Sequence, residues 1–152
     1  MFKKIVSGGQ TGVDRAALDA ALSLEVPCGG WCPKGRKAED GRLDARYPLK
    51  EARSREYAER TTLNVRDSDG TLVLTIGEPS GGTLQTINDA ARLERPCLVL
   101  DISIHAKKST VLSWAKNNSV RILNIAGPRE SKSNGIYKRS FSFIKKLLSS
   151  EK

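Results

Sequence analysis

The sequence contains few of the residues that disulfide frameworks and metal sites require, with 3 cysteines and 1 histidine among 152 residues. The number of cysteines is odd, which argues against a disulfide framework. No pair among Cys28, Cys32 and Cys97 has the C-x-x-C spacing of a zinc ribbon, which argues against a structural zinc site. With His105 as the single histidine, we expect no metal ion held by protein ligands alone. Cys28 and Cys32 stay open to two interpretations, as ordinary residues near a loop or as soft ligands to a metal–sulfur cofactor.

Long hydrophobic runs are absent as well. The first apolar run ends at Val6, where Ser7, Gly8 and Gly9 follow, and this is far too early for a signal peptide or a membrane span. We therefore expect a cytoplasmic protein with no membrane contact. The chain has no linker, internal repeat or low-complexity tract, and its 38% hydrophobic content suits a single domain over residues 1–152.

Negative charge is scarce in the last third of the chain. The formal net charge is +9, and residues 102–152 hold 11 Lys and Arg against 2 Asp and Glu, so this segment carries the whole excess. A basic segment can bind nucleic acid. Because few aromatic residues for base stacking lie between these charges, we interpret the segment as a solvated surface and do not expect nucleic-acid binding.

What the chain does have is a short apolar strand that runs into a glycine-rich turn and then a helix over residues 13–24. The turn predicts an anion cradle, because glycines let the backbone approach a ligand and the helix N-terminus offers unpaired N–H groups. The alternative is a tight turn without a ligand, and the dinucleotide fingerprint G-x-G-x-x-G is absent. Thr11 is placed to cap the helix, and Asp14 either completes a capping box or leaves a carboxylate at the rim. The candidate ligand-binding residues of this turn are Gly8, Gly9, Gln10, Thr11, Gly12 and Asp14.

The same arrangement recurs further along the chain. Residues 70–76 form the strongest predicted strand, and a nearly continuous apolar run of this kind is typical of a buried parallel strand. A turn and a helix follow, with Thr83 as the expected cap and with Leu84, Ile87, Ala90 and Ala91 as the expected inner stripe. The second set of candidate ligand-binding residues is Ser80, Gly81, Gly82 and Thr83.

The segment between the two cradles is harder to interpret. Residues 32–47, which include Lys34 and Arg36, have no usable periodicity, and we favour a functional flap over a disordered loop. Residues 49–69 are helical in character, either whole or broken near Arg60. Arg60, Asn64 and Asp67 share one face of this helix, for which a solvated polar face is the default interpretation.

Further strands over 97–101 and 120–126 alternate with helices over 106–118 and near the C-terminus. This alternation predicts an α/β fold with a parallel sheet covered on both faces, in which ligands lie outside the carboxyl ends of the strands. Both glycine turns would emerge at that edge, together with the 127–131 loop and its Arg129. Three such loops on one edge indicate a ligand that bears a phosphate.

The order of these motifs resembles the molybdenum-cofactor carrier family, a branch of the Rossmann-like proteins related to LOG-type phosphoribohydrolases and bacterial DNA-processing proteins. The matching segments are IVSGGQTGVDRAALD (5–19), CPKGRKAEDG (32–41), RTTLNVRDSDGT (60–71), SGGT (80–83) and NIAGPRES (124–131). The resemblance implies a Rossmann-like three-layer α/β/α sandwich with a mostly parallel sheet. It also implies a cytosolic homo-oligomer, a dimer or tetramer, that holds the molybdenum cofactor (molybdopterin) or a nucleotide-like relative for transfer to molybdoenzymes.

The resemblance further implies that Lys34, Arg36, Arg60, Asn64 and Asp67 contact the ligand, because all five fall within the matching segments. An arginine there would clamp a phosphate, and the Asn and Asp side chains would bind ring or hydroxyl groups.

Two other functions stay open. LOG-type relatives carry P-G-G-x-G-T-x-x-E with a catalytic glutamate, and this chain has Thr86 at that position, so a phosphoribohydrolase would need Asp14, Asp67 or Asp69 as a substitute. Single-stranded DNA binding is the third hypothesis, because the first turn is also similar to a loop of DNA-processing proteins. We expect a carrier without turnover, since no nucleophile and base are matched in the sequence.

Overall fold

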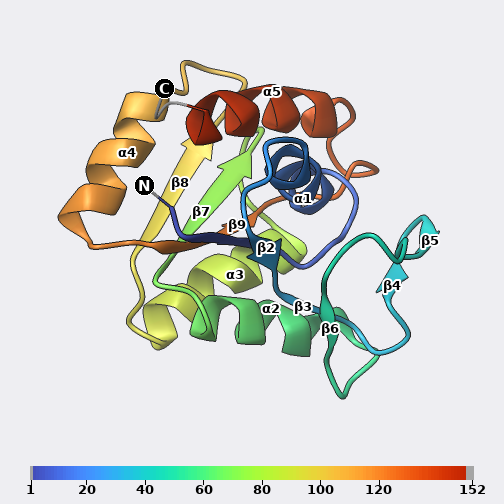
Figure 1. The fold of residues 1–152 in the computed structure, drawn as a ribbon. Coiled ribbons are helices and arrows are strands. Elements are labelled where there is room, and N and C mark those ends of the chain that lie inside the picture. The colour runs from blue at the N-terminus through green and yellow to red at the C-terminus, as the bar shows by residue number, and fades with distance from the viewer. Residues whose placement is uncertain (1, 150–152) are drawn as a thin grey trace.

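The computed structural model describes residues 2–149, so both ends of the predicted 1–152 domain lie outside the described residues. A five-stranded, all-parallel sheet runs through the centre of the molecule (Figure 1). In spatial order its strands are β2 (Cys28–Gly29), β1 (Lys4–Val6), β9 (Ile122–Ala126), β7 (Gly70–Thr75) and β8 (Cys97–Asp101). The predicted parallel sheet is thereby confirmed.

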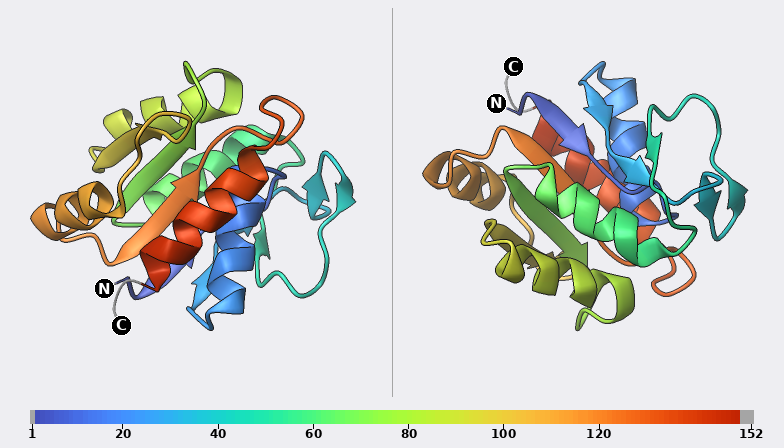
Figure 2. Two further views of the ribbon diagram at one scale, coloured as in Figure 1. Left: turned by 90° about the horizontal axis from the view of Figure 1, so that it is seen from above. Right: turned by 90° about the horizontal axis from the view of Figure 1, so that it is seen from below.

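Helices cover both faces of this sheet, which confirms the three-layer α/β/α sandwich. Helices α1, α4 and α5 lie on one face, and α2 and α3 lie on the other (Figure 2). Their bounds are α1 (Val13–Ser23), α2 (Tyr57–Arg66), α3 (Gly81–Arg92), α4 (Lys108–Asn117) and α5 (Ile136–Leu148). None of the helices between residues 2 and 149 has the length and apolar character that a bilayer-spanning helix needs.

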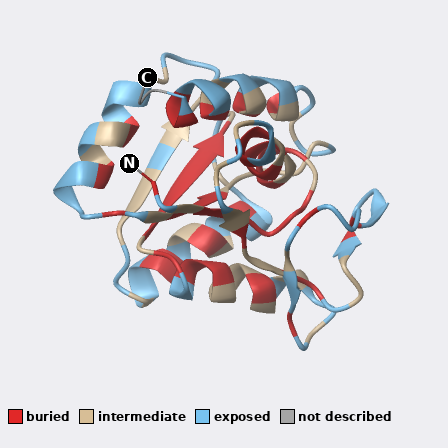
Figure 3. Cartoon of the chain, in the orientation of Figure 1, coloured by how far each residue is buried: buried red, intermediate tan, exposed pale blue. Residues whose placement is uncertain are grey.

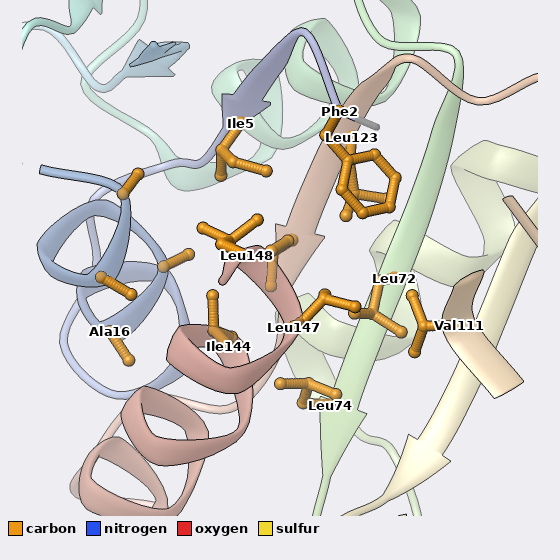
Figure 4. Packing of buried hydrophobic residues seen from close by; sticks show 14 of the residues in the cluster. Phe2, Ile5, Ala16, Leu72, Leu74, Val111, Leu123, Ile144, Leu147 and Leu148 are labelled. Carbon is orange, nitrogen blue, oxygen red and sulfur yellow. The ribbon is translucent and has the colours of Figure 1, made fainter. Parts of the chain in front are cut away.

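The main hydrophobic core lies between the sheet and the α1, α4 and α5 layer. Leu72 and Leu74 of β7 are fully buried and lie close to Ile144, Leu147 and Val111 from the helices above them (Figure 4). Strand β7 is buried along its whole length (Figure 3), as the apolar run in the sequence predicts. This core fixes the positions at which the parallel strands end, and those ends carry the candidate site.

The opposite layer is more polar than predicted, and the expected inner stripe of α3 is only partly confirmed, because Ala90 is buried and Ile87 is half-buried but Leu84 and Ala91 are exposed. Leu84 is 45% exposed, whereas Thr83, Thr86, Asp89 and Ala90 are buried. The reason is the neighbouring helix α2, because Thr62 on α2 donates a hydrogen bond to Asp89 at 2.7 Å. Asp89 and Gln85 of α3 therefore face α2, and Gln85 donates to the carbonyl of Ala58 at 3.0 Å.

Residues 31–52 form a folded extension at one side of the sandwich, which we call the 31–52 lobe (Figure 1). It contains two small sheets, the parallel pair β3 (Trp31–Cys32) with β6 (Lys50–Glu51) and the antiparallel hairpin β4 (Lys37–Ala38) with β5 (Gly41–Arg42). Leu18 of α1 packs with the lobe in a second hydrophobic cluster. The lobe members of that cluster are Cys32, Ala38, Leu43 and Tyr47.

The predicted helix over 49–69 is wrong in its first part. Lys50 and Glu51 pair with β3 instead, and the helix begins at Tyr57 and continues unbroken through Arg60. The backbone N–H groups of residues 50 and 52 donate to the carbonyls of Gly30 and Cys32, both at 2.8 Å. Pairing with residues about 20 positions away thus overrides the local helical character.

Neither threonine cap forms. The N-cap residue of α1 is Gly12, and a Cβ there would stand 2.3 Å from the carbonyl oxygen of Pro128, so the close approach of the two loops requires a glycine. The Thr11 hydroxyl instead donates to Glu39 and accepts from the backbone N–H of Glu130. Helix α3 has Ser80 at its N-cap, without a side-chain cap.

Candidate functional site

A pocket of about 280 Å³ opens at the carboxyl ends of β1, β7 and β9, where the three predicted loops converge. Helix α2 and the N-terminus of α3 supply the remaining walls. Many of the predicted ligand-binding residues line the pocket; these are Gly8, Gln10, Asp14, Arg60, Asn64, Ser80, Gly82, Thr83 and Arg129. The other predicted residues lie outside its lining; they are Gly9, Thr11, Gly12, Lys34, Arg36, Asp67 and Gly81.

The backbone N–H groups of the first glycine turn are already bound by the chain itself. Those of Gly9, Gln10 and Thr11 donate to Ser7 Oγ, Asp14 Oδ2 and Gln10 Oε1, at 3.3, 3.3 and 3.0 Å. The N–H of the first helical residue donates to the carbonyl of Pro128 at 3.3 Å. This turn therefore holds internal acceptors, one of which is a carboxylate, and offers few free donors to a ligand.

Asp14 and Arg60 form a buried ion pair in the wall of the pocket. Arg60 Nη1 lies 3.1 Å from Asp14 Oδ2, and both side chains are less than a tenth exposed. A Cβ on Gly8 would stand 1.8 Å from the same nitrogen, so only glycine leaves room for the guanidinium. Burial raises the pKa of Asp14 above its ordinary value, although Arg60 and the N–H of Gln10 oppose this.

The second glycine turn is the one that is open to an anion. The N–H groups of Gly81 and Gly82 have no acceptor among residues 2–149. A Cβ on Gly82 would meet nothing within 4 Å, and the Nζ of Lys132 lies 3.0 Å from the corresponding position on Gly81. Free N–H groups, the positive end of the α3 dipole and a lysine ammonium thus point to one place at the pocket.

Tyr57 and Lys132 are among the pocket residues that sequence reasoning missed. Tyr57 lies one helical turn before Arg60 in α2, and three cations surround its ring, with Lys37, Arg60 and Arg129 at 4.5, 5.2 and 5.6 Å from the centroid. Lys132 lies three residues after Arg129, immediately beyond the loop that the sequence does single out. An aromatic residue at helical spacing from Arg60 was the available signal for the first.

Gln10 presents a buried donor without a partner. Its Oε1 accepts from the N–H groups of Thr11 and Glu39, at 3.0 and 2.8 Å, and this fixes the orientation of the amide. Its Nε2 is buried and has no hydrogen-bond partner among the described residues. A buried donor left in this state costs about 1–3 kcal/mol, which a ligand oxygen would recover.

Arg36 and Asp67, two of the predicted site residues outside the pocket, have structural contacts instead. The Arg36 guanidinium donates to four backbone carbonyls that close the 31–52 lobe, those of Leu43, Asp44, Tyr47 and Leu49. Asp67 accepts from the indole Nε1 of Trp31 at 2.9 Å, and Lys34 is exposed.

The two cysteines near the lobe also lie away from the pocket. Cys32 is buried in the second cluster and Cys28 is half-buried, and neither lines the pocket. Burial raises the pKa of both thiols, which disfavours the thiolate form that a soft metal ligand needs. Within the described chain, no group of three or more His, Cys, Asp or Glu side chains is placed to hold a metal ion.

The turn of the β4–β5 hairpin carries two carboxylates that tie the lobe to the rest of the fold. Asp40 makes a bidentate pair with Arg15, with both N–O distances at 3.0 Å. Glu39 accepts from the hydroxyl of Ser131 at 2.6 Å and from Thr11. The Arg15 hydrogen bonds lower the pKa of Asp40; for Glu39, partial burial raises the pKa, but the hydrogen bonds outweigh it and the net shift is downward.

We expect the hairpin turn to detach in acid. A carboxyl group whose pKa is lower in the folded state stabilises the fold above its ordinary pKa, and that stability is lost as the pH falls through the lowered value. The backbone N–H of Glu39 donates to Gln10. In an NMR titration from about pH 6 to about pH 2, its amide resonance should move away from the chemical shift of the hydrogen-bonded state. The Ala52 amide, which donates to Cys32 at 2.8 Å, is the control and should hold its shift. Simultaneous loss of both would contradict a local release.

Comparisons with known proteins agree with this architecture. The sequence profile of the circularly permutated YpsA SLOG family matches residues 5–148. A crystal structure from Syntrophus aciditrophicus SB, of a protein named "putative molybdenum carrier protein", is 42% identical and covers 97% of this chain and 96% of its own, with a TM-score of 0.93. None of the curated proteins compared matches this chain. Because the family profile spans nearly the whole described chain, this protein belongs to the circularly permutated YpsA SLOG family.

Proposed function

We propose that this protein is a carrier that binds a phosphate-bearing small molecule in the pocket, and that the cargo is the molybdenum cofactor. The observation that carries the proposal is the open N-terminus of α3, where two free backbone N–H groups lie beside Lys132. A phosphate bound there would be held by charge-assisted hydrogen bonds, and Arg129, in the same loop as Lys132, also lines the pocket.

The pocket also fits the rest of such a ligand. Its volume of about 280 Å³ is close to the lower end of the range of roughly 300–1,000 Å³ typical of small-molecule sites, which is room enough for a phosphate and a ring system. Gln10 Nε2 supplies a donor for a carbonyl or ring nitrogen. Asn64 also lines the pocket, but its amide already accepts from the backbone N–H of Trp31 at 2.7 Å and donates to the Trp31 carbonyl at 3.0 Å. The name of the 42% identical neighbour supports the choice of a molybdenum-containing cargo over other phosphate-bearing molecules.

The test is to purify the protein from cells that synthesise the cofactor and to release any bound pterin by denaturation. Pterin fluorescence at a stoichiometric level, lost in an Arg129→Ala/Lys132→Ala variant purified in parallel, is the expected result. Repeated purification without pterin, together with no heat of binding in a titration with inorganic phosphate, would contradict the proposal.

A phosphoribohydrolase is the second candidate, and one observation favours it. Of the three aspartates that could replace the missing glutamate, Asp14 lines the pocket, whereas Asp67 and Asp69 do not. Burial raises the pKa of Asp14, as a general acid requires. Thr86, at the position of the LOG-type glutamate, lines the pocket but donates its hydroxyl hydrogen to the carbonyl of Gly82 at 3.0 Å. Release of base from a panel of nucleoside monophosphates by the native chain would favour this function over carriage.

We also propose that the protein is a cytoplasmic homo-oligomer, which would transfer its cargo to molybdoenzymes. Leu84 of α3 and Val99 of the edge strand β8 are 45% and 40% exposed, and the two elements lie in contact. Burial of such side chains against a second copy would stabilise a dimer. Light scattering after size exclusion should give a multiple of the monomer mass of 16.6 kDa, and a monomer across the accessible concentration range would contradict this expectation.

A further inference from the structure

The Glu39 carboxylate lies among donors that come from two other segments of the chain. It accepts from the hydroxyl of Thr11 in the first glycine turn. It also accepts from both the hydroxyl and the backbone N–H of Ser131, at 2.6 and 3.3 Å. The Nη1 of Arg129 lies 3.9 Å from Glu39 Oε1. Two hydroxyl groups, one backbone N–H and one guanidinium thus converge on a single anionic group.

This set of donors is not specific to a carboxylate. Hydroxyl groups, backbone N–H groups and arginine are the groups that proteins use to bind phosphate oxygens. The carboxylate is held in its ionised form, because the hydrogen bonds lower the pKa of Glu39. Glu39 therefore occupies these donors as an anion supplied by the chain itself.

The donors are continuous with the pocket. Arg129 lines the pocket and also faces Glu39, and Lys132 of the same loop lies beside the open N-terminus of α3. On the other side, Gln10 lines the pocket and accepts the backbone N–H of Glu39 at 2.8 Å. Arg129 and Gln10 thus connect the lining of the pocket to Glu39.

We propose that Thr11, Arg129 and Ser131 form a second anion subsite, and that a ligand with two linked phosphates displaces Glu39 from it. The first phosphate is bound at α3, so this inference rests on the proposed function for that group. The ligand class is accordingly a diphosphate, of which the second phosphate takes the place of the carboxylate.

Displacement of Glu39 does not require the lobe to unfold. The lobe is also held by the second hydrophobic cluster, by the four carbonyl contacts of Arg36 and by the pair between Asp40 and Arg15. Glu39 lies in the turn between two-residue strands, and Gly41, with φ of +115°, follows that turn. The movement needed is therefore local to the turn.

The alternative is that Glu39 only stabilises the attachment of the 31–52 lobe to the rest of the fold. The matched control is Asp40, its neighbour in the turn, which also lies in an ion pair to the main fold but bonds none of the donors of Thr11, Arg129 and Ser131. Asp40→Ala and Glu39→Ala each remove one negative charge, and each removes one contact between the hairpin turn and the main fold. They differ in whether a set of anion donors is uncovered.

The experiment is calorimetric titration of the full chain with inorganic pyrophosphate. We expect Glu39→Ala to bind it about tenfold or more tightly than the native chain, and Asp40→Ala to change the affinity by about twofold or less. Addition of Ser131→Ala to Glu39→Ala should abolish the gain. Thermal unfolding confirms that each variant is folded, and Glu39→Ser, which also shortens the side chain and uncovers the donors, takes its place if the alanine variant is not.

The outcomes separate this inference from the proposed function. No gain in Glu39→Ala, or an equal gain in Asp40→Ala, would overturn the second subsite even if the native chain binds inorganic phosphate. A native chain that binds no phosphate, together with a Glu39→Ala variant that binds pyrophosphate through Ser131, would contradict the proposed carrier site and support the subsite. Failure of both chains to bind pyrophosphate overturns the subsite.

Discussion

Replacement of Asp14 by asparagine is expected to destabilise the fold by about 3–5 kcal/mol, because it leaves the buried Arg60 guanidinium without its counterion. Both side chains are less than a tenth exposed, so little water can take the place of the lost partner. Urea denaturation at neutral pH measures the change.

A second substitution tests the cause. Since burial raises the pKa of Asp14, the ionised pair adds little net stability over an apolar pair, and Asp14→Asn/Arg60→Met should recover most of the loss. The matched control is Asp40→Asn, which breaks an aspartate–arginine pair with a 53% exposed carboxylate and should cost about 1 kcal/mol or less. Equal losses in Asp14→Asn and Asp40→Asn would show that the pair in the pocket wall is not desolvated in solution.

Replacement of Gly82 by aspartate is expected to weaken binding of inorganic phosphate by about tenfold or more, because the new carboxylate would occupy the N-terminus of α3. The structure leaves room for it, since a Cβ at this position meets nothing within 4 Å. The fold should be retained or slightly stabilised, because a negative charge in the first turn of a helix is favourable. Calorimetric titration and thermal unfolding of the same samples measure the two effects.

The control for this variant is Gly82→Ala, which adds a side chain at the same place without a charge. It should bind phosphate with an affinity within about threefold of the native chain. If Gly82→Asp binds phosphate as well as the native chain does, the anion lies elsewhere, and the first glycine turn becomes the place to search.

The two glycine turns illustrate how far a local pattern determines a site. Both turns have the residues of an anion cradle, and the sequence predicts their position at one edge of the sheet, where the structure also places them. The pattern does not decide which backbone N–H groups stay free. In the first turn Ser7, Gln10 and Asp14 take them, and in the second turn no described side chain does.

The lobe illustrates the opposite case. Its residues lack a helical or strand period, and their order depends on contacts between segments that are distant in the chain, such as the packing of Leu43 and Tyr47 against Leu18. The same dependence explains why Arg36, within a matching motif, faces backbone carbonyls. Tyr57 lines the pocket only because the packing of α2 brings its ring close to Arg129 of a distant loop.

The sequence by itself determined the α/β class, the parallel sheet with its buried β7 and the edge at which the loops meet, because apolar periodicity and glycine positions act over a few residues. Only the tertiary structure decided which donors at that edge are free, that Arg60 is neutralised by Asp14, and that Glu39 occupies donors next to the pocket. Hydrogen bonds and ion pairs of this kind join residues that lie 46 and 92 positions apart, and such pairings depend on how the helices and loops pack rather than on local pattern.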